Sequence, residues 1–245
     1  MIHPTPVQTQ DVELDHWPPI RKEYLNYETT FVILHPFLKL KEGETDDIDF
    51  KKRHKKNIIK KTTPVSWIDI IQKAQLKDIK ELDRLLAYLH AANYKADRAA
   101  WIKFRTYIDS TGIIDATIDD YPDLLTDITL QSLIELGYEE VFLFSDTEEN
   151  QKKYLIQSLI ESPKSIPLSH QRILTPDNKI IIATDFDQRF SYLSSSKILV
   201  AELINKINPE GFYCNETTKS HWSDEPSAND LIDWSSPERY EKYNT

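Results

Sequence analysis

The chain contains very little glycine, which limits the kinds of ligand site it can build. Only four of its 245 residues are glycine. Dinucleotide- and phosphate-binding loops need several glycines, because their backbone must come close to a phosphate group. Neither GxGxxG nor GxxxxGK[ST] occurs, which disfavours nucleotide binding by these two routes. The HExxH, CxxC, GxSxG and EF-hand spacings are also missing, so the commonest metal-site and nucleophile signatures are excluded.

Cysteine and long apolar runs are scarce as well. Cys214 is the only cysteine, so no intramolecular disulfide can form, which fits a reducing cytosol. The longest purely apolar runs, such as Ile180–Ala183, are far too short to span a bilayer. The opening residues MIHPTPVQTQDVELDHW lack the basic and apolar regions of a secretory signal. We therefore expect a soluble cytoplasmic protein that has no membrane contact and no cofactor.

The charge is unevenly distributed along the chain. Residues 1–50 carry a net charge of −6, residues 51–105 carry +10, and residues 106–245 carry −14, which together give −10. The middle of the chain is thus basic, whereas both flanking parts are acidic. This asymmetry predicts that different faces of the protein meet different partners.

The composition is sufficient for one folded domain. Hydrophobic residues make up 40% of the chain and aromatic residues 11%, which is enough to form a core. The proline-rich residues 1–28 are predicted to form an N-terminal arm. A single domain is predicted over residues 29–222, with a helical layer at about 64–110. The acidic residues 223–245 are predicted to form a tail that wraps the domain.

Local patterns predict several elements in the first two thirds of the chain. Thr29–Leu34 is β-branched and aromatic, which predicts a strand that Pro36 ends. Ser66 is a suitable N-cap for a helix beginning at Trp67, with Asp69 in its first turn. Apolar residues at helical spacing predict further helices over residues 82–89, 96–108, 119–136 and 148–160.

The C-terminal half is expected to supply most of the sheet. Short apolar runs predict strands over residues 140–144, 171–174, 179–185, 190–193 and 212–214. Thr175–Asn178 predicts a hairpin turn, and Ser194–Ser196 are expected to cap a helix over residues 197–207. The predicted fold class is α+β: a mixed β-sheet built mainly from the C-terminal half, packed against a helical N-terminal and middle region.

Asp185 and Asp187 are the first candidates for a catalytic or metal site. Strand alternation places both carboxylates on one face at the end of a buried strand. Two close carboxylates can bind Mg²⁺ or divide acid and base roles. His170 and His221 are the nearest histidines in sequence, and they complete a hypothetical site for a metal-dependent hydrolase. In the structural alternative, both aspartates lie in a loop and cap backbone N–H groups or pair with Arg189.

Two further candidates lie near the C-terminus and in the basic region. Cys214 is either a nucleophile with His221 as its base or a small core residue. His221 and Trp222 either clamp a ligand or close the core. The basic run Lys51–Lys61 either binds a phosphate backbone or forms a solvated loop that pairs with the acidic residues 42–49. The overall acidity makes nucleic acid the less favoured partner.

The segment FVILHPF at residues 31–37 and the run from Ile180 to Trp222, which ends GFYCNETTKSHW, carry a resemblance. They resemble an uncharacterised family of Gram-positive bacterial proteins that is known only as a domain of unknown function. The ending is also similar to small immunity-type proteins of bacterial toxin systems. This resemblance implies a bacterial cytosolic protein and transfers no catalytic residue.

Three functions follow as hypotheses. The leading one is a non-catalytic binding module, of the immunity or regulatory type, whose acidic surface engages a basic protein partner. The first alternative is the metal-dependent hydrolase that uses Asp185 and Asp187. The second alternative is nucleic-acid binding through Lys51–Lys61. Nothing in the sequence predicts the oligomeric state or the identity of the partner.

Overall fold

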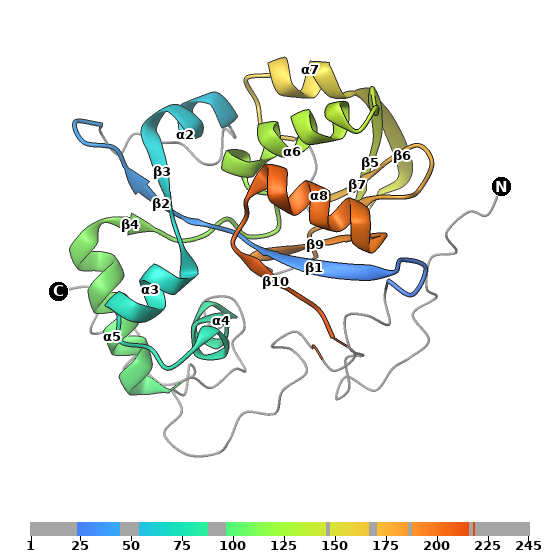
Figure 1. The fold of residues 1–245 in the computed structure, drawn as a ribbon. Helices are drawn as coiled ribbons and strands as arrows, with labels where there is room; N and C mark the ends of the chain where they lie inside the picture. The colour runs from blue at the N-terminus through green and yellow to red at the C-terminus, as the bar shows by residue number, and fades with distance from the viewer. Residues whose placement is uncertain are drawn as a thin grey trace.

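A seven-stranded sheet organises the protein (Figure 1). The computed structural model describes residues 24–44, 54–87, 97–145, 148–166, 171–185, 188–215 and 218. Within these residues the strand order is β10-β1-β9-β8-β7-β5-β6, and each pairing is antiparallel. The strands are β1 Thr29–Leu34, β5 Glu140–Ser145, β6 Glu148–Leu155, β7 Gln171–Leu174, β8 Ile181–Ala183, β9 Phe190–Ser195 and β10 Gly211–Tyr213. The predicted α+β class is confirmed, with six of these seven strands in the C-terminal half.

One face of this sheet is covered by three helices, α6 (Asp123–Glu135), α7 (Ile156–Glu161) and α8 (Lys197–Ile207), which lie side by side in Figure 1. Alternate residues of the strands, such as Ile33 and Leu193, point to this face and are buried against Leu133 and Leu203. A continuous apolar core therefore fills the space between the sheet and these helices.

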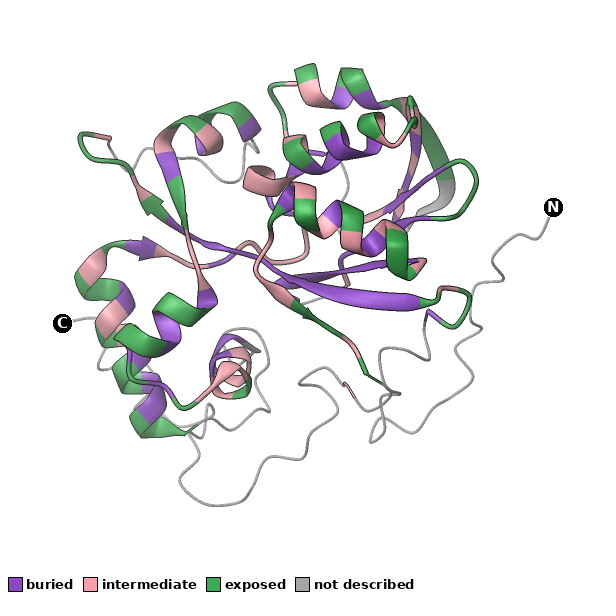
Figure 2. Ribbon diagram, in the orientation of Figure 1, coloured by how far each residue is buried: buried purple, intermediate pink, exposed green. Residues whose placement is uncertain are grey.

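The other face of the sheet packs against a smaller, largely helical part of the chain. This part has a three-stranded sheet in the order β3-β2-β4, with β2 Phe37–Leu40, β3 Thr62–Val65 and β4 Ile113–Ile114. Its helices are α2 Lys55–Lys61, α3 Trp67–Lys73, α4 Ile79–Ala87 and α5 Arg98–Thr111. Phe37, Trp67 and Phe104 share one apolar cluster with Val32 and Tyr192 of the large sheet. Strand β1 is accordingly buried along its whole length (Figure 2).

The predicted local signals are confirmed at several element ends. The hydroxyl of Ser66 accepts a hydrogen bond from the backbone N–H of Asp69 at the start of α3. Ser196 caps α8 in the same way, by accepting from Leu199. The predicted turn between β7 and β8 closes with a 2.9 Å hydrogen bond from the N–H of Asn178 to the carbonyl of Thr175. The two N-caps and the turn each depend on residues that are close together in the sequence, so local sequence patterns can predict them.

The helix predicted over residues 148–160 is wrong in its first part. Residues 148–155 form β6, which pairs with β5, and only Ile156–Glu161 are helical. The apolar residues 154, 155, 159 and 160 suggested a helical stripe, but Ile156 and Leu159 are the residues that are buried. A charged segment such as 148–153 suits an edge strand, because one side of it remains in water.

The two sheets meet at His35, where the chain passes from β1 to β2. The imidazole is fully buried. Its Nδ1 lies 2.7 Å from the carbonyl oxygen of Thr117, and its Nε2 lies 2.7 Å from the hydroxyl oxygen of Ser191. A carbonyl only accepts, so Nδ1 donates the proton and Nε2 accepts from Ser191. The Ser191 oxygen then accepts from Thr184, 2.6 Å away, which completes a directed chain of hydrogen bonds.

The backbone of His35 is also held from both sides. Its N–H donates to the carbonyl of Arg189, and its carbonyl accepts from Nε1 of Trp67 at 2.7 Å. Burial lowers the pKa of His35 to about 3, so the ring is neutral at physiological pH. An unfolded chain takes up this proton near pH 6.5. The stabilising contribution is therefore full above pH 6.5 and declines as the pH falls toward 3.

The search for membrane spans gives a negative result for this part of the chain. No helix among the described ranges combines the length and the apolar character needed to cross a bilayer.

Candidate functional site

Among the candidates for the predicted carboxylate site, Asp185 is the one that lies within the described residues, directly after β8. Its Oδ1 accepts a 3.1 Å hydrogen bond from a terminal guanidinium nitrogen of Arg172, and the pair is about four-fifths buried. The other terminal nitrogen of Arg172 donates to the hydroxyl of Tyr24 at 3.3 Å. The candidates at positions 170, 187 and 221 lie outside the described residues. The structure therefore brings Asp185 to an arginine and leaves the predicted cluster untested.

Asp185 pairs with Arg172, an arginine that the sequence analysis did not consider, and pairing of Arg189 with Asp187 stays a prediction because residue 187 lies outside the described residues. The guanidinium of Arg189 is buried and donates to the carbonyl of Leu86 at 3.0 Å. Arg172 reaches Asp185 because the β7–β8 register sets Arg172 opposite Ala183, two residues before Asp185. A hairpin register of this kind cannot be read from a spacing of two aspartates.

Aromatic side chains surround the Arg172–Asp185 pair on the same face of the sheet. The strand registers align Phe144, Arg172, Ala183 and Tyr192 in one row across four neighbouring strands. Tyr24 packs on Tyr192, with ring centroids 5.5 Å apart. Tyr24 thus contacts Tyr192 with its ring and Arg172 with its hydroxyl, and these two contacts hold the start of the described chain against the sheet. The arrangement stabilises the face and neutralises the Asp185 charge.

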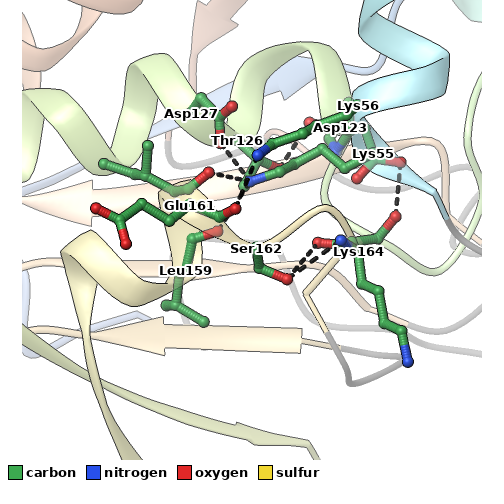
Figure 3. A network of polar contacts seen from close by, with 12 residues as sticks. Lys55, Lys56, Asp123, Thr126, Asp127, Leu159, Glu161, Ser162 and Lys164 are labelled. Carbon is green, nitrogen blue, oxygen red and sulfur yellow. Dashed lines mark hydrogen bonds and ion pairs between the residues drawn. The ribbon is translucent and has the colours of Figure 1, made fainter.

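The described part of the basic run forms a helix and contains a buried lysine, which differs from the predicted solvated loop. Lys55–Lys61 form helix α2, and the Lys55 side chain is fully buried. Its ammonium donates to Oδ1 of Asp127 at 2.5 Å and to the carbonyls of Leu159 and Ile160 (Figure 3). Lys55 therefore fastens α2 to α6 and to the C-terminal turn of α7, where unpaired carbonyls attract a cation.

Neighbouring charges in the run are also engaged. The ammonium of Lys56 donates to the carbonyl of Glu161 at 2.9 Å (Figure 3). The Lys61 ammonium lies 3.8 Å from the carboxylate of Glu44, which confirms the predicted pairing with the acidic loop at this contact. Lys60 is exposed. Residues 51–53 of the run lie outside the described residues. Two of the four described lysines of the run thus act as helix-end ligands, which weakens the case for a phosphate-binding strip.

The most acidic part of the described chain is the stretch 106–145. It has nine carboxylates and no lysine or arginine, a net charge of −9. Among the ion pairs of the described residues, four cations from outside the stretch pair with five of these carboxylates. These cations are Lys55, Arg105, Lys153 and Lys206. Asp119, Asp120 and Asp123 lie together before and at the start of α6 and are partly exposed. The stretch itself therefore supplies only negative side-chain charge.

Cys214 occupies a structural position next to β10. Its N–H donates to the carbonyl of Thr30 at 2.9 Å, and its side chain packs against the apolar cluster that contains Trp67. The prediction of a small core residue agrees with this contact. His221, its proposed base, lies outside the described residues, as does Trp222.

Two residues at the centre of the structure were not singled out individually from the sequence. His35 lies in the segment FVILHPF, where a histidine between two apolar strands and before a proline is the only signal. Lys55 is one lysine among several, and no local feature distinguishes it. A search of the described residues finds no group of three or more metal-ligating side chains. The hydrogen bonds of His35 and Lys55 give both residues a structural role.

Replacing Lys55 tests whether the basic run is structural. Lys55→Met leaves Asp127 and two helix-end carbonyls without their cation, so the free energy of unfolding should fall by about 3 kcal/mol. Chemical denaturation measures this change. The matched variant Lys60→Met removes an exposed charge and should change stability by less than about 0.5 kcal/mol. If the two substitutions changed the free energy of unfolding equally, Lys55 would contribute no more to stability than an exposed lysine.

The Arg172–Asp185 pair can be separated from a metal site by two measurements. A double-mutant cycle with Arg172→Met and Asp185→Asn should give a coupling energy of about 0.5–1 kcal/mol, because the pair is partly exposed. Mg²⁺, Mn²⁺ or Zn²⁺ should leave the melting temperature unchanged relative to EDTA. A metal-dependent rise that Asp187→Asn abolishes would overturn the structural role and restore the hydrolase hypothesis.

Comparison with known proteins identifies a family and no activity. The family model described as protein of unknown function (DUF2711) matches residues 18–224. The match covers the large sheet, the three helices on it and the smaller helical part. Searches of curated proteins and of solved structures find no match. On the extent of this match, the chain belongs to the DUF2711 family of proteins of unknown function.

Proposed function

We propose that the protein is a non-catalytic binding module, of the immunity or regulatory type, that engages a basic protein partner. The observation that carries this proposal is the net charge of −9 over residues 106–145, which contain no lysine or arginine. A surface with such an excess attracts cationic partners over several ångströms and speeds their association.

Three carboxylates of the stretch lie close together in the chain. Asp119, Asp120 and Asp123 lie within five residues, between β4 and the first turn of α6. Asp119 has a positive φ of 64°, and its N–H donates to the carbonyl of Gln188 at 3.1 Å. The large sheet therefore fixes the backbone of this segment. A fixed backbone lowers the entropy cost of ordering the segment when a partner binds.

The competing functions find less support in the described geometry. Asp185 is neutralised by Arg172, and Lys55 is enclosed by Asp127 and two carbonyls. Both sites use their charge to stabilise the fold. A group whose charge is already satisfied contributes little further attraction to a metal ion or a phosphate.

Charge-specific capture tests the proposal. The immobilised full chain is exposed to lysate of its own cells, and bound proteins are identified at low and at high ionic strength. A basic partner should bind at low salt and be lost near 1 M salt, where the screening length is only about 3 Å. The triple variant Asp119→Asn, Asp120→Asn, Asp123→Asn should lose the same partner at low salt.

A second triple variant provides the matched control. Lys73→Gln, Lys77→Gln and Lys80→Gln remove three exposed charges from the helical part and should leave capture of the basic partner intact. Thermal melting confirms that each variant is folded. The proposal would be contradicted if every captured protein stayed bound at high salt and also bound to the triple aspartate variant.

A further inference from the structure

The terminal strand β10 presents an edge that the rest of the described structure leaves unpaired. It pairs with β1 on one side, and no strand of the described ranges lies on its other side. Phe212 is 38% exposed and Tyr213 is 51% exposed, unusually high values for aromatic residues in a strand. An edge of this kind is a template for pairing with a further strand.

The register with β1 shows which backbone groups point outward. The N–H of Leu34 donates to the carbonyl of Glu210, and the N–H of Cys214 donates to the carbonyl of Thr30. Antiparallel pairs alternate between bonded and non-bonded positions, so residues 210, 212 and 214 turn their polar groups toward β1. The N–H and carbonyl groups of Gly211 and Tyr213 consequently point to the open side of the strand.

We propose that this open edge pairs with the β10 edge of a second copy of the chain, antiparallel about a two-fold axis at Phe212. Gly211 of each copy then lies opposite Tyr213 of the other, and both residues present outward-facing groups. The two pairs form four backbone hydrogen bonds. Phe212 lies opposite its own symmetry mate in a non-bonded pair, where side chains approach most closely. The large sheet continues through the interface.

The side chains of β10 suit this self-pairing. Gly211 has no side chain, and a Cβ there would lie 1.9 Å from the carbonyl oxygen of Val32 and 2.5 Å from the Phe31 ring. The Phe31 ring of the same copy therefore already lies across Gly211, which requires glycine at this position. Phe31 already meets Tyr213 edge-on within one copy, with ring centroids 5.1 Å apart. Pairing joins the two aromatic clusters across the axis.

Charge supports a second copy as the occupant. Residues 211–215, GFYCN, contain no charged side chain, so self-pairing places no like charges opposite each other. The opposite edge of the sheet differs in this respect. Strand β6, EENQKKYL, contains four charged residues, of which Lys152 and Lys153 are exposed. Charged edge strands of this kind resist association. The two edges therefore differ, and β10 is the one suited to symmetric pairing.

Register-specific crosslinking tests the proposal with the full chain. In a Cys214→Ser background, Phe212→Cys places two cysteines opposite each other across the axis, with Cα atoms about 4.5 Å apart. Mild oxidation should convert this variant to a disulfide-linked dimer. Tyr213→Cys in the same background is the matched control, because its two cysteines lie about 8–9 Å apart and exceed the bridging limit.

Sedimentation over a wide concentration range tests the pairing without cysteine. The natural chain should show a monomer–dimer equilibrium that high salt does not abolish, which distinguishes it from the charge-dependent binding proposed above. Tyr213→Pro removes an outward N–H and should give a monomer, and Tyr213→Lys should do the same by placing charge beside the axis. Lys153→Pro makes the equivalent change at the β6 edge and should leave the dimer intact. The N–H of Ile156 donates to the carbonyl of Glu139, and polar groups alternate in direction along a strand, so the N–H of Lys153 points away from β5.

Melting curves of the variants confirm that they are folded. A monomer at all concentrations, or no more crosslinking in Phe212→Cys than in Tyr213→Cys, would overturn the proposal. In that case the edge is covered by residues of the chain that follow Thr218 or by another protein.

Discussion

The buried imidazole of His35 is the interaction on which the two-sheet arrangement depends. It lies at the point where the chain leaves β1 of the large sheet and enters β2 of the small one. Its two ring nitrogens and its two backbone groups contact three different segments, at Thr117, at Arg189 and Ser191, and at Trp67. A ring with one donor and one acceptor satisfies Thr117 and Ser191 only when it is neutral. Burial and hydrogen bonding therefore require the same protonation state.

Several charged residues, like His35, join different elements of the fold. Lys55 fastens α2 to two helices of the large-sheet layer, and Glu210 accepts from the first two backbone N–H groups of α3. Arg172 and Asp185 pair beneath Tyr24 on the opposite face. Each of these charges lies at a junction between elements that are distant in sequence. We propose recognition at two surfaces with different chemistry, the acidic stretch 106–145 and the neutral, aromatic edge at β10.

The predictions from the sequence succeed where neighbouring residues determine the structure. The caps at Ser66 and Ser196, the turn at Thr175–Asn178 and the strand at Thr29–Leu34 depend on short-range signals, and all four are confirmed. Segment 148–155 was predicted wrongly because its pairing with β5 outweighs its helical spacing. Strand direction and order depend on contacts between distant segments, which no local pattern contains.

The candidate site was harder to predict for the same reason. The contact between Arg172 and Asp185 depends on the β7–β8 register, and the burial of Lys55 depends on where α6 and α7 lie. A lysine in a basic run and a histidine before a proline carry no local mark of being buried. The predicted site residues at 170, 187 and 221 stay predictions, because they lie outside the described residues.

The most direct test of this structural organisation is the protonation state of His35 in the folded chain. Nitrogen NMR of the imidazole, followed as the pH is lowered, reports both the tautomer and the pKa. The structure predicts one neutral tautomer with the proton on Nδ1, and no titration until the pH approaches about 3 or the chain unfolds. A ring that titrates near pH 6.5 in the folded protein, or that carries its proton on Nε2, would contradict a neutral His35 joining the two sheets.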